Sequence, residues 1–108
     1  MEWSIKYHPS AYDELSNLDG SIKKIVLKGI LKVSANPKPQ SEGGYGKPLG
    51  NKGGNNLTGL LKIKFRNIGI RVVYKLIEDE NTHETHILVI SVRSDNEVYN
   101  IAVKRNDC

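Results

Sequence analysis

The chain has 108 residues, a formal net charge of +4 and a pI near 9.2, which suits a single domain with one core. The excess of Lys and Arg favours an anionic partner, either a polyanion or an acidic protein. No stretch approaches the roughly 20 consecutive apolar residues of a membrane helix, and the first residues lack the pattern of a signal peptide. The single cysteine, Cys108, excludes an internal disulfide and has no second cysteine for a metal site. We therefore expect a soluble cytoplasmic domain that binds no metal and no small-molecule cofactor.

The N-terminal third predicts one strand followed by two helices. Residues 3–7 alternate between apolar and polar side chains, as a strand does. Pro9 suits the first turn of a helix, and Asp19-Gly20 ends that helix. A second helix is predicted to begin near Ser21 as its N-cap and to end by Asn36, because the prolines that follow cannot continue it. The two amphipathic helices would form an antiparallel hairpin.

From residue 37 to residue 59 the composition shifts to Gly, Pro, Asn and Ser. The glycine runs at 43–46 and 50–56 predict a long mobile connection and no packed element. Leu49 is the one apolar anchor there, and it marks either a brief strand or a contact with the core. The glycine run lacks the Gly-Lys-Ser/Thr ending of a phosphate-binding loop, which argues against a nucleotide site. A connection of this length is either functional or disordered, and we favour a loop that contacts a partner.

A β-hairpin is predicted over residues 60–77, with its turn at Asn67-Ile68-Gly69, where glycine tolerates a positive φ. Its first strand alternates between apolar and cationic side chains, so that Lys62, Lys64 and Arg66 share one side. Three aligned cations repel one another, and a bound RNA would offset that repulsion. A solvated strand face, or a lysine-rich sheet edge that avoids aggregation, explains the same pattern equally well.

The last third predicts a turn, a strand and a helix. Residues 78–81 form a polar turn, and the near-continuous apolar stretch at 86–92 is typical of a central strand. A final helix runs from about residue 96 to residue 104, with Ser94 or Asp95 as its N-cap. The whole order predicts an α+β fold in which the helices pack on one face of a mainly antiparallel sheet.

Four stretches of the chain stand out in combination: Leu-Lys-Ile-Lys-Phe-Arg (61–66), Gly-Ile-Arg-Val-Val-Tyr (69–74), Ile-Ser-Val-Arg (90–93) and Glu-Val-Tyr-Asn-Ile-Ala (97–102). Together they resemble the RelE/ParE superfamily of small bacterial toxins from toxin–antitoxin pairs. The resemblance implies a twisted antiparallel sheet with an N-terminal helical hairpin against one side. The RelE branch cuts messenger RNA on the ribosome and is silenced by an antitoxin, whereas the ParE branch inhibits DNA gyrase. A degenerate member that only binds its partner is a third reading, because a shared fold does not fix function.

The resemblance also implies a site, residue by residue. Lys62 and Lys64 match the paired strand lysines of the RelE motif, Arg71 its next-strand arginine, Arg93 the arginine after the last strand, and Tyr99 the tyrosine of the terminal helix. The implied catalytic group is Lys64, Arg71, Arg93 and Tyr99, and the RNA-binding group is Lys62, Lys64, Arg66 and Lys75. The segment between residues 92 and 99 is shorter than in the RelE type and has lost some of its basic residues. It contains an acidic residue, Asp95, instead.

Cleavage of RNA by its own 2′-OH needs a group that takes the 2′ proton, positive charge for the phosphorane and help for the leaving 5′ oxygen. Histidine usually moves such protons, but the three histidines lie far from the cationic strand in the sequence, and we expect them to be incidental: His8, His83 and His86. Lys64 would then be the base, because neighbouring cations disfavour its protonated form. Arg71 and Arg93 would hold the phosphate through their guanidinium groups, and Tyr99 would stack on a base or share proton transfer.

Each of these residues also has a structural explanation. Arg71 could form an ion pair with Glu97, and Tyr99 could cover the core with its ring. The expected partners are the ribosome, messenger RNA and an acidic, partly disordered antitoxin that folds as it wraps this surface. The antitoxin would either mask the basic groove or displace the terminal helix, and the sequence favours neither mode.

Overall fold

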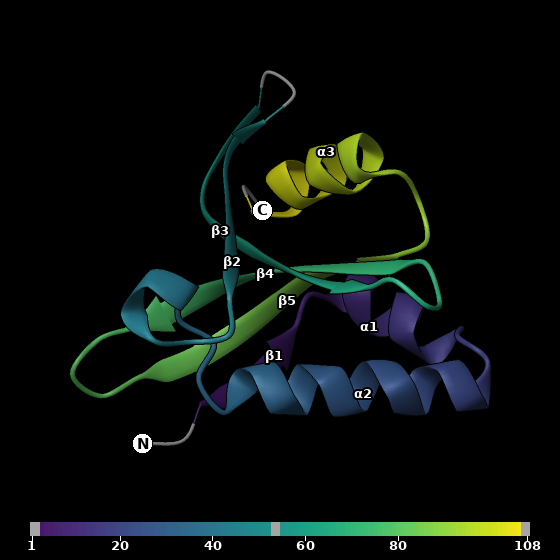
Figure 1. Cartoon of the computed structure of the whole chain (residues 1–108), viewed down its shortest axis with the longest axis horizontal. Coiled ribbons are helices and arrows are strands. Elements are labelled where there is room, and N and C mark those ends of the chain that lie inside the picture. Colours follow the sequence, from purple (N-terminus) through teal and green to yellow (C-terminus); the bar gives the residue numbers. More distant parts are fainter. Residues whose placement is uncertain (1–2, 53–54, 107–108) are drawn as a thin grey trace.

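The structure of the protein is a computed structural model that describes residues 3–52 and 55–106, so Cys108 lies outside the described residues. The described elements, in chain order, are β1 Ser4–Tyr7, α1 Pro9–Ser16, α2 Gly20–Ser34, the 3₁₀ helix η1 Gln40–Glu42, β2 Lys47–Lys52, β3 Asn55–Phe65, β4 Ile70–Glu78, β5 His83–Ser91 and α3 Asp95–Asn106 (Figure 1). The strands form one sheet in the order β1-β5-β4-β3-β2, in which only the β1–β5 pair is parallel. The predicted α+β class is confirmed. No helix of the described residues is long and apolar enough to span a membrane.

The two N-terminal helices begin at side-chain caps. The Nδ1 atom of His8 accepts a hydrogen bond from the backbone N–H of Ser10 at 3.1 Å, and Pro9 occupies the first helical turn. Asp19, and not the predicted Ser21, caps α2, since its carboxylate accepts bonds from both the N–H and the hydroxyl of Ser21. A carboxylate two residues before Ser21 reaches the free N–H groups of the first turn. The helix therefore begins earlier in the chain than predicted, at Gly20.

Helices cover both faces of the sheet, so the prediction that all of them pack on one face is wrong. Figure 1 shows α1 and α2 on one side and α3 on the other. The α1/α2 side holds the larger core, which includes Val26, Ile30 and Tyr74. The α3 side holds a second core, in which α3 covers β3, β4 and β5. The near-continuous apolar sequence of β5 follows from this arrangement, because its side chains are buried on both faces.

The expectation of an unpacked connection over residues 37–59 is also wrong. β2 and the first half of β3 pair with each other within it, and Leu49 is 3 % exposed in the core beneath α3. Pro37 is fully buried, and its carbonyl accepts a hydrogen bond from the hydroxyl of Tyr74 at 2.9 Å. Burial raises the pKa of this Tyr74 hydroxyl far above its ordinary value. Pairing with β3 therefore orders a segment whose composition alone is typical of a loop.

Gly46 tests whether this segment is packed. A Cβ atom at this position would lie 2.5 Å from a Leu61 methyl, 2.6 Å from the Tyr74 hydroxyl and 2.7 Å from the Pro37 carbonyl. We expect Gly46→Ala to lower the free energy of unfolding by about 1–3 kcal/mol through overpacking, measured by urea denaturation. Gly20→Ala is the control, because a Cβ there meets nothing within 4 Å and alanine favours a helix. Equal stability of the two variants would contradict the packed arrangement.

Candidate functional site

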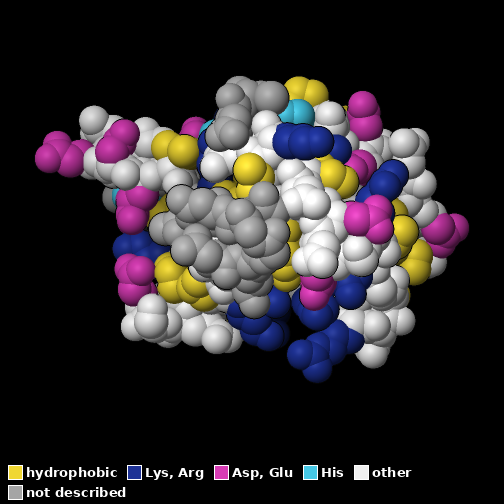
Figure 2. Space-filling model, turned by 90° about the horizontal axis from the view of Figure 1, so that it is seen from above, with side chains coloured by type: hydrophobic (Ala, Val, Ile, Leu, Met, Phe, Trp, Pro, Cys, Tyr) yellow, Lys and Arg dark blue, Asp and Glu magenta, His cyan; other side chains and the backbone are white. Residues whose placement is uncertain are grey.

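The cations of β3 lie on the face that α3 partly covers. Lys62 and Lys64 are on the same side of β3 as Leu60, which packs in the core beneath α3. β3 lies between β2 and β4 at Lys62, so the edge-strand explanation is excluded for this lysine, whereas β2 begins at Lys47 and does not extend along β3 as far as Lys64. Lys62 pairs across the sheet with Lys47, and Lys64 with Arg71, which places like charges opposite each other. Figure 2 shows Lys and Arg side chains gathered at one edge of the molecule, with acidic side chains among them.

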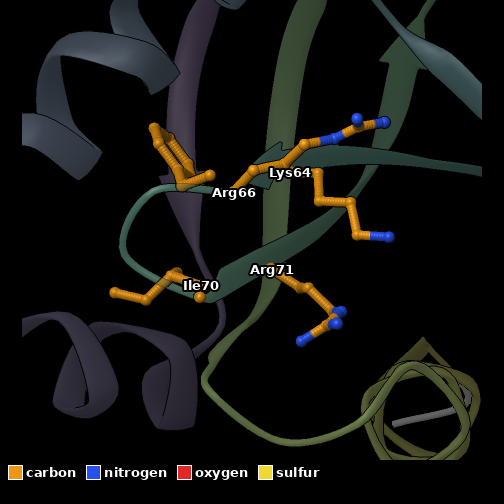
Figure 3. A pocket seen from close by; sticks show the side chains of 6 residues that line it. Lys64, Arg66, Ile70 and Arg71 are labelled. Atoms are coloured by element: carbon orange, nitrogen blue, oxygen red, sulfur yellow. The ribbon is translucent and has the colours of Figure 1, made fainter.

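Three of the predicted catalytic positions meet at the start of α3. Nη1 of Arg71 donates a hydrogen bond to the backbone carbonyl of Arg93 at 2.9 Å. The carboxylate of Asp95 lies between Arg71 and Lys64: its Oδ1 pairs with Nε of Arg71, and its Oδ2 is 3.7 Å from Nζ of Lys64. In Figure 3 the side chains of Lys64 and Arg71 extend towards α3, Arg66 leaves the hairpin on the same side but points away from α3, and Ile70 points the other way.

Asp95 changes the electrostatics that the sequence predicts. Lys64 does not face cations alone, which removes the premise of like-charge crowding at this residue. Partial burial of Asp95 acts to raise the pKa of its carboxyl. The hydrogen bond and charge of Arg71, together with the charges of Lys64 and Lys62, outweigh this, so the pKa of Asp95 lies below its ordinary value. The site therefore contains an ionised carboxylate that belongs to the protein itself, that of Asp95.

The predicted Arg71–Glu97 ion pair is wrong. Glu97 pairs instead with Arg93, whose Nη1 is 3.1 Å from its carboxylate, and this Arg93 side chain is 61 % exposed. The hydroxyl of Ser94 accepts from the N–H of Glu97 at 3.4 Å and so caps α3, as predicted for Ser94. The guanidinium of Arg93 thus lies outside the Asp95 cluster, and only its main chain contributes to that cluster.

The remaining predicted residues lie apart from the cluster. Tyr99 is 4 % exposed and packs in the core beneath α3 with Val73 and Leu88, which is its predicted structural role. Lys75 lies four residues beyond Arg71 along β4, towards the other end of the face. The structure therefore brings together Lys64, Arg71 and the main chain of Arg93, with Lys62 within electrostatic range of Asp95.

A small cavity adjoins these cations. It has a volume of about 200 Å³, and its polar lining comes from Lys64, Arg66 and Arg71. A larger hollow of about 410 Å³ shares Lys64 and Arg66 and extends to Ile25 of α2. Among the described residues, no group of three His, Cys, Asp or Glu side chains lies together as a metal site. The charges present suit a phosphate group with an apolar surface beside it.

Comparisons with solved structures decide the fold. A mutant of the E. coli toxin RelE in its free state superposes with a TM-score of 0.72 at 23 % identity, covering 97 % of this chain and 98 % of that chain. The chain has the RelE fold. The E. coli RelBE toxin–antitoxin complex gives a TM-score of 0.63 at 16 % identity, with 85 % and 98 % of the two chains covered.

The Mycobacterium tuberculosis RelBE2 complex gives a similar result, with a TM-score of 0.63 at 22 % identity, covering 88 % of this chain and 95 % of that chain. No family model matches the sequence, and no curated protein matches it significantly. At these identities the likeness confirms the predicted RelE/ParE resemblance at the level of fold. Because the RelE fold is shared over nearly the whole chain, β3, β4 and α3 are parts of that fold and not additions to it.

Proposed function

We propose that this protein is the toxin of a toxin–antitoxin pair and that it cleaves messenger RNA on the ribosome. The observation that carries the proposal is the junction of Lys64, Arg71 and the Arg93 carbonyl beside a small cavity on a RelE fold. Some of the solved structures that resemble this chain are complexes of a toxin with its antitoxin, which supports an antitoxin as the partner of this chain too. An acidic antitoxin would match the net charge of +4.

In this proposal Arg71 is the main phosphate ligand. Its bond to the Arg93 carbonyl fixes the guanidinium plane, so the remaining N–H groups can meet phosphate oxygens in a bidentate way. Arg66 adds positive charge from the adjoining strand, and Lys64 does so once it has taken up the 2′ proton, which stabilises the negative charge that builds on the phosphorane. These interactions would be stronger in the transition state than in the ground state, as catalysis requires.

The cleavage step moves one proton at each end of the reaction. The 2′ oxygen attacks the neighbouring phosphorus and gives its proton to a base, for which we propose Lys64 once Asp95 has moved away and left it among cations. The bond from phosphorus to the 5′ oxygen breaks, and that oxygen takes up a proton from water as it leaves. The products are a 2′,3′-cyclic phosphate and a free 5′-hydroxyl. Tyr99 could reach the RNA only if α3 shifts, because its side chain is buried.

Asp95 must give way for this reaction. A phosphate and the Asp95 carboxylate carry the same charge and use the same two cations, so both cannot occupy the junction at once. The ribosome would supply the positioning that lets RNA compete with this internal anion. We therefore expect little cleavage of free RNA by the isolated protein.

The test is incubation of the purified protein with translating ribosomes, followed by mapping of the message ends. We expect new ends within codons on the ribosome, and none when ribosomes are left out. The principal alternative is a ParE-type inhibitor of DNA gyrase, which shares the fold and needs no catalytic residues. Gyrase-linked DNA breaks with intact messages would replace our proposal with that alternative. Intact messages and intact DNA would leave a non-catalytic binding protein.

A further inference from the structure

A second basic cavity lies on the same face of the sheet, near the C-terminal end of α3. It has a volume of about 300 Å³, and its charged lining includes Lys6, Lys75, Glu84 and Arg105. Two imidazoles, those of His8 and His86, complete its polar wall. The sequence singles out only Lys75 of this cluster, because β1, β4, β5 and α3 contribute to it from both ends of the chain.

Three basic residues of this cavity form a row across the sheet. His86 on β5 pairs in register with Lys6 on β1 and with Lys75 on β4. Neighbouring strands lie about 4.8 Å apart, so the three side chains stand next to one another on one face. That face is the one under α3, because Lys75 is the cross-strand partner of Leu60 in the α3-side core.

Two carboxylates near this row are engaged with basic groups, Glu14 with Arg105 and Glu84 with the row's own His86. Glu14 binds Arg105 through both of its oxygens, at 2.8 and 3.2 Å, and Arg105 also donates to the carbonyl of Leu88 at 2.8 Å. Glu84 lies 2.8 Å from Nε2 of His86. Within the described part of the chain, neither Lys6 nor Lys75 has an ion-pair partner. Two ammonium groups without an ion-pair partner among the described residues therefore flank an imidazole that a carboxylate orients.

We propose that this cavity is a second phosphate-binding site, which holds the backbone of the same RNA strand that reaches Lys64 and Arg71. The inference rests on the proposed RNA-cleaving function for the identity of its ligand. Lys75 and Arg71 are four residues apart on β4, which is about 13 Å along an extended strand. The RNA would cross α3 and contact a cationic site at each end of this helix, so that the second site sets the direction and position of the strand.

The test is the salt dependence of RNA binding by the isolated protein. The probe is a labelled single strand with 2′-deoxy sugars, which cannot be cleaved because it has no 2′ hydroxyl to attack the phosphate. Its affinity for the protein is followed by fluorescence anisotropy over a range of salt concentrations. Each phosphate contact to a single strand contributes about 0.7 to the slope of log affinity against log salt. Lys6→Gln/Lys75→Gln should therefore reduce this slope by about 1.4 and weaken binding about tenfold at low salt.

The matched control is Lys24→Gln/Lys28→Gln, which removes two exposed lysines from α2 on the opposite face. The control should leave the slope nearly unchanged. An equal change of this slope in the two double variants would overturn the proposal of a second phosphate-binding site. Because this assay involves no ribosome and no cleavage, failure of the nuclease proposal would leave its result intact.

Discussion

Replacing both Lys64 and Arg71 with alanine is expected to reduce the rate of message cleavage on ribosomes by about a thousandfold or more. Removal of a single group that stabilises transition-state charge typically costs a factor of 10²–10³, and this variant removes two that act on one phosphate. The two residues are cross-strand partners, so their effects should not be additive. Each single variant should therefore lose a large part of the activity that the double variant loses.

The control variant for this experiment must keep the fold and must carry the same change of net charge as Lys64→Ala/Arg71→Ala. Lys24→Ala/Lys28→Ala on α2 changes the charge equally at exposed positions of the opposite face. It should cleave messages at nearly the unmodified rate. Circular dichroism of both double variants separates a loss of chemistry from a loss of structure. Cleavage that persists in a folded Lys64→Ala/Arg71→Ala protein would remove these residues from the catalytic site.

Replacing Asp95 with asparagine is expected to strengthen RNA binding by about fivefold. Asparagine keeps the shape of the side chain but removes the charge that competes with a phosphate for Arg71 and Lys64. A partly exposed ion pair of this kind is typically worth up to about 1 kcal/mol, which corresponds to a factor of about five in affinity. The measurement is a binding titration with the uncleavable RNA at low salt.

Two comparisons make this prediction specific to the site. Glu80→Gln removes an exposed carboxylate in the β4–β5 turn and controls for net charge. In the Lys64→Ala/Arg71→Ala background, Asp95→Asn should bring no gain, because the cations that the carboxylate occupies are absent. Weaker binding or slower cleavage by Asp95→Asn would show that Asp95 takes part in the reaction and does not block it.

The same residue gives a pH dependence of stability. The pKa of Asp95 is lower in the folded protein than in the unfolded chain, where an aspartate titrates near 3.9. Its contribution to stability is therefore fully present above that unfolded value and is lost as the pH falls through the lower, folded value. Asp95→Asn should remove this part of the acid dependence, which urea denaturation at several pH values measures.

Periodicity in the sequence predicted most of the elements, because their apolar side chains recur at the spacing of the structure they form. It indicated β2 only through Leu49, which lies in a strand and in the core as two of its readings predicted, since Gly50 and the residues around it lack the side chains that mark a strand. β2 exists because β3 offers a free edge for pairing, and such pairing is a tertiary effect that composition does not reveal.

The ion pairs of α3 show a second limit. Asp95 and Glu97 are two residues apart, so they point to different sides of the helix, and only the orientation of α3 decides which one meets Arg71. That orientation depends on how Val98 and Ala102 pack on the sheet, which the sequence does not specify. The sequence could therefore propose Lys64 and Arg71 as a pair but not the anion that joins them.

A crystal structure of the protein with a short RNA carrying 2′-deoxy sugars tests the central claim most directly. We predict that a backbone phosphate lies between the side chains of Lys64 and Arg71, where the carboxylate of Asp95 now lies, and that Asp95 has moved away from both. An intact Asp95–Arg71 pair with the RNA bound on another surface would contradict this account.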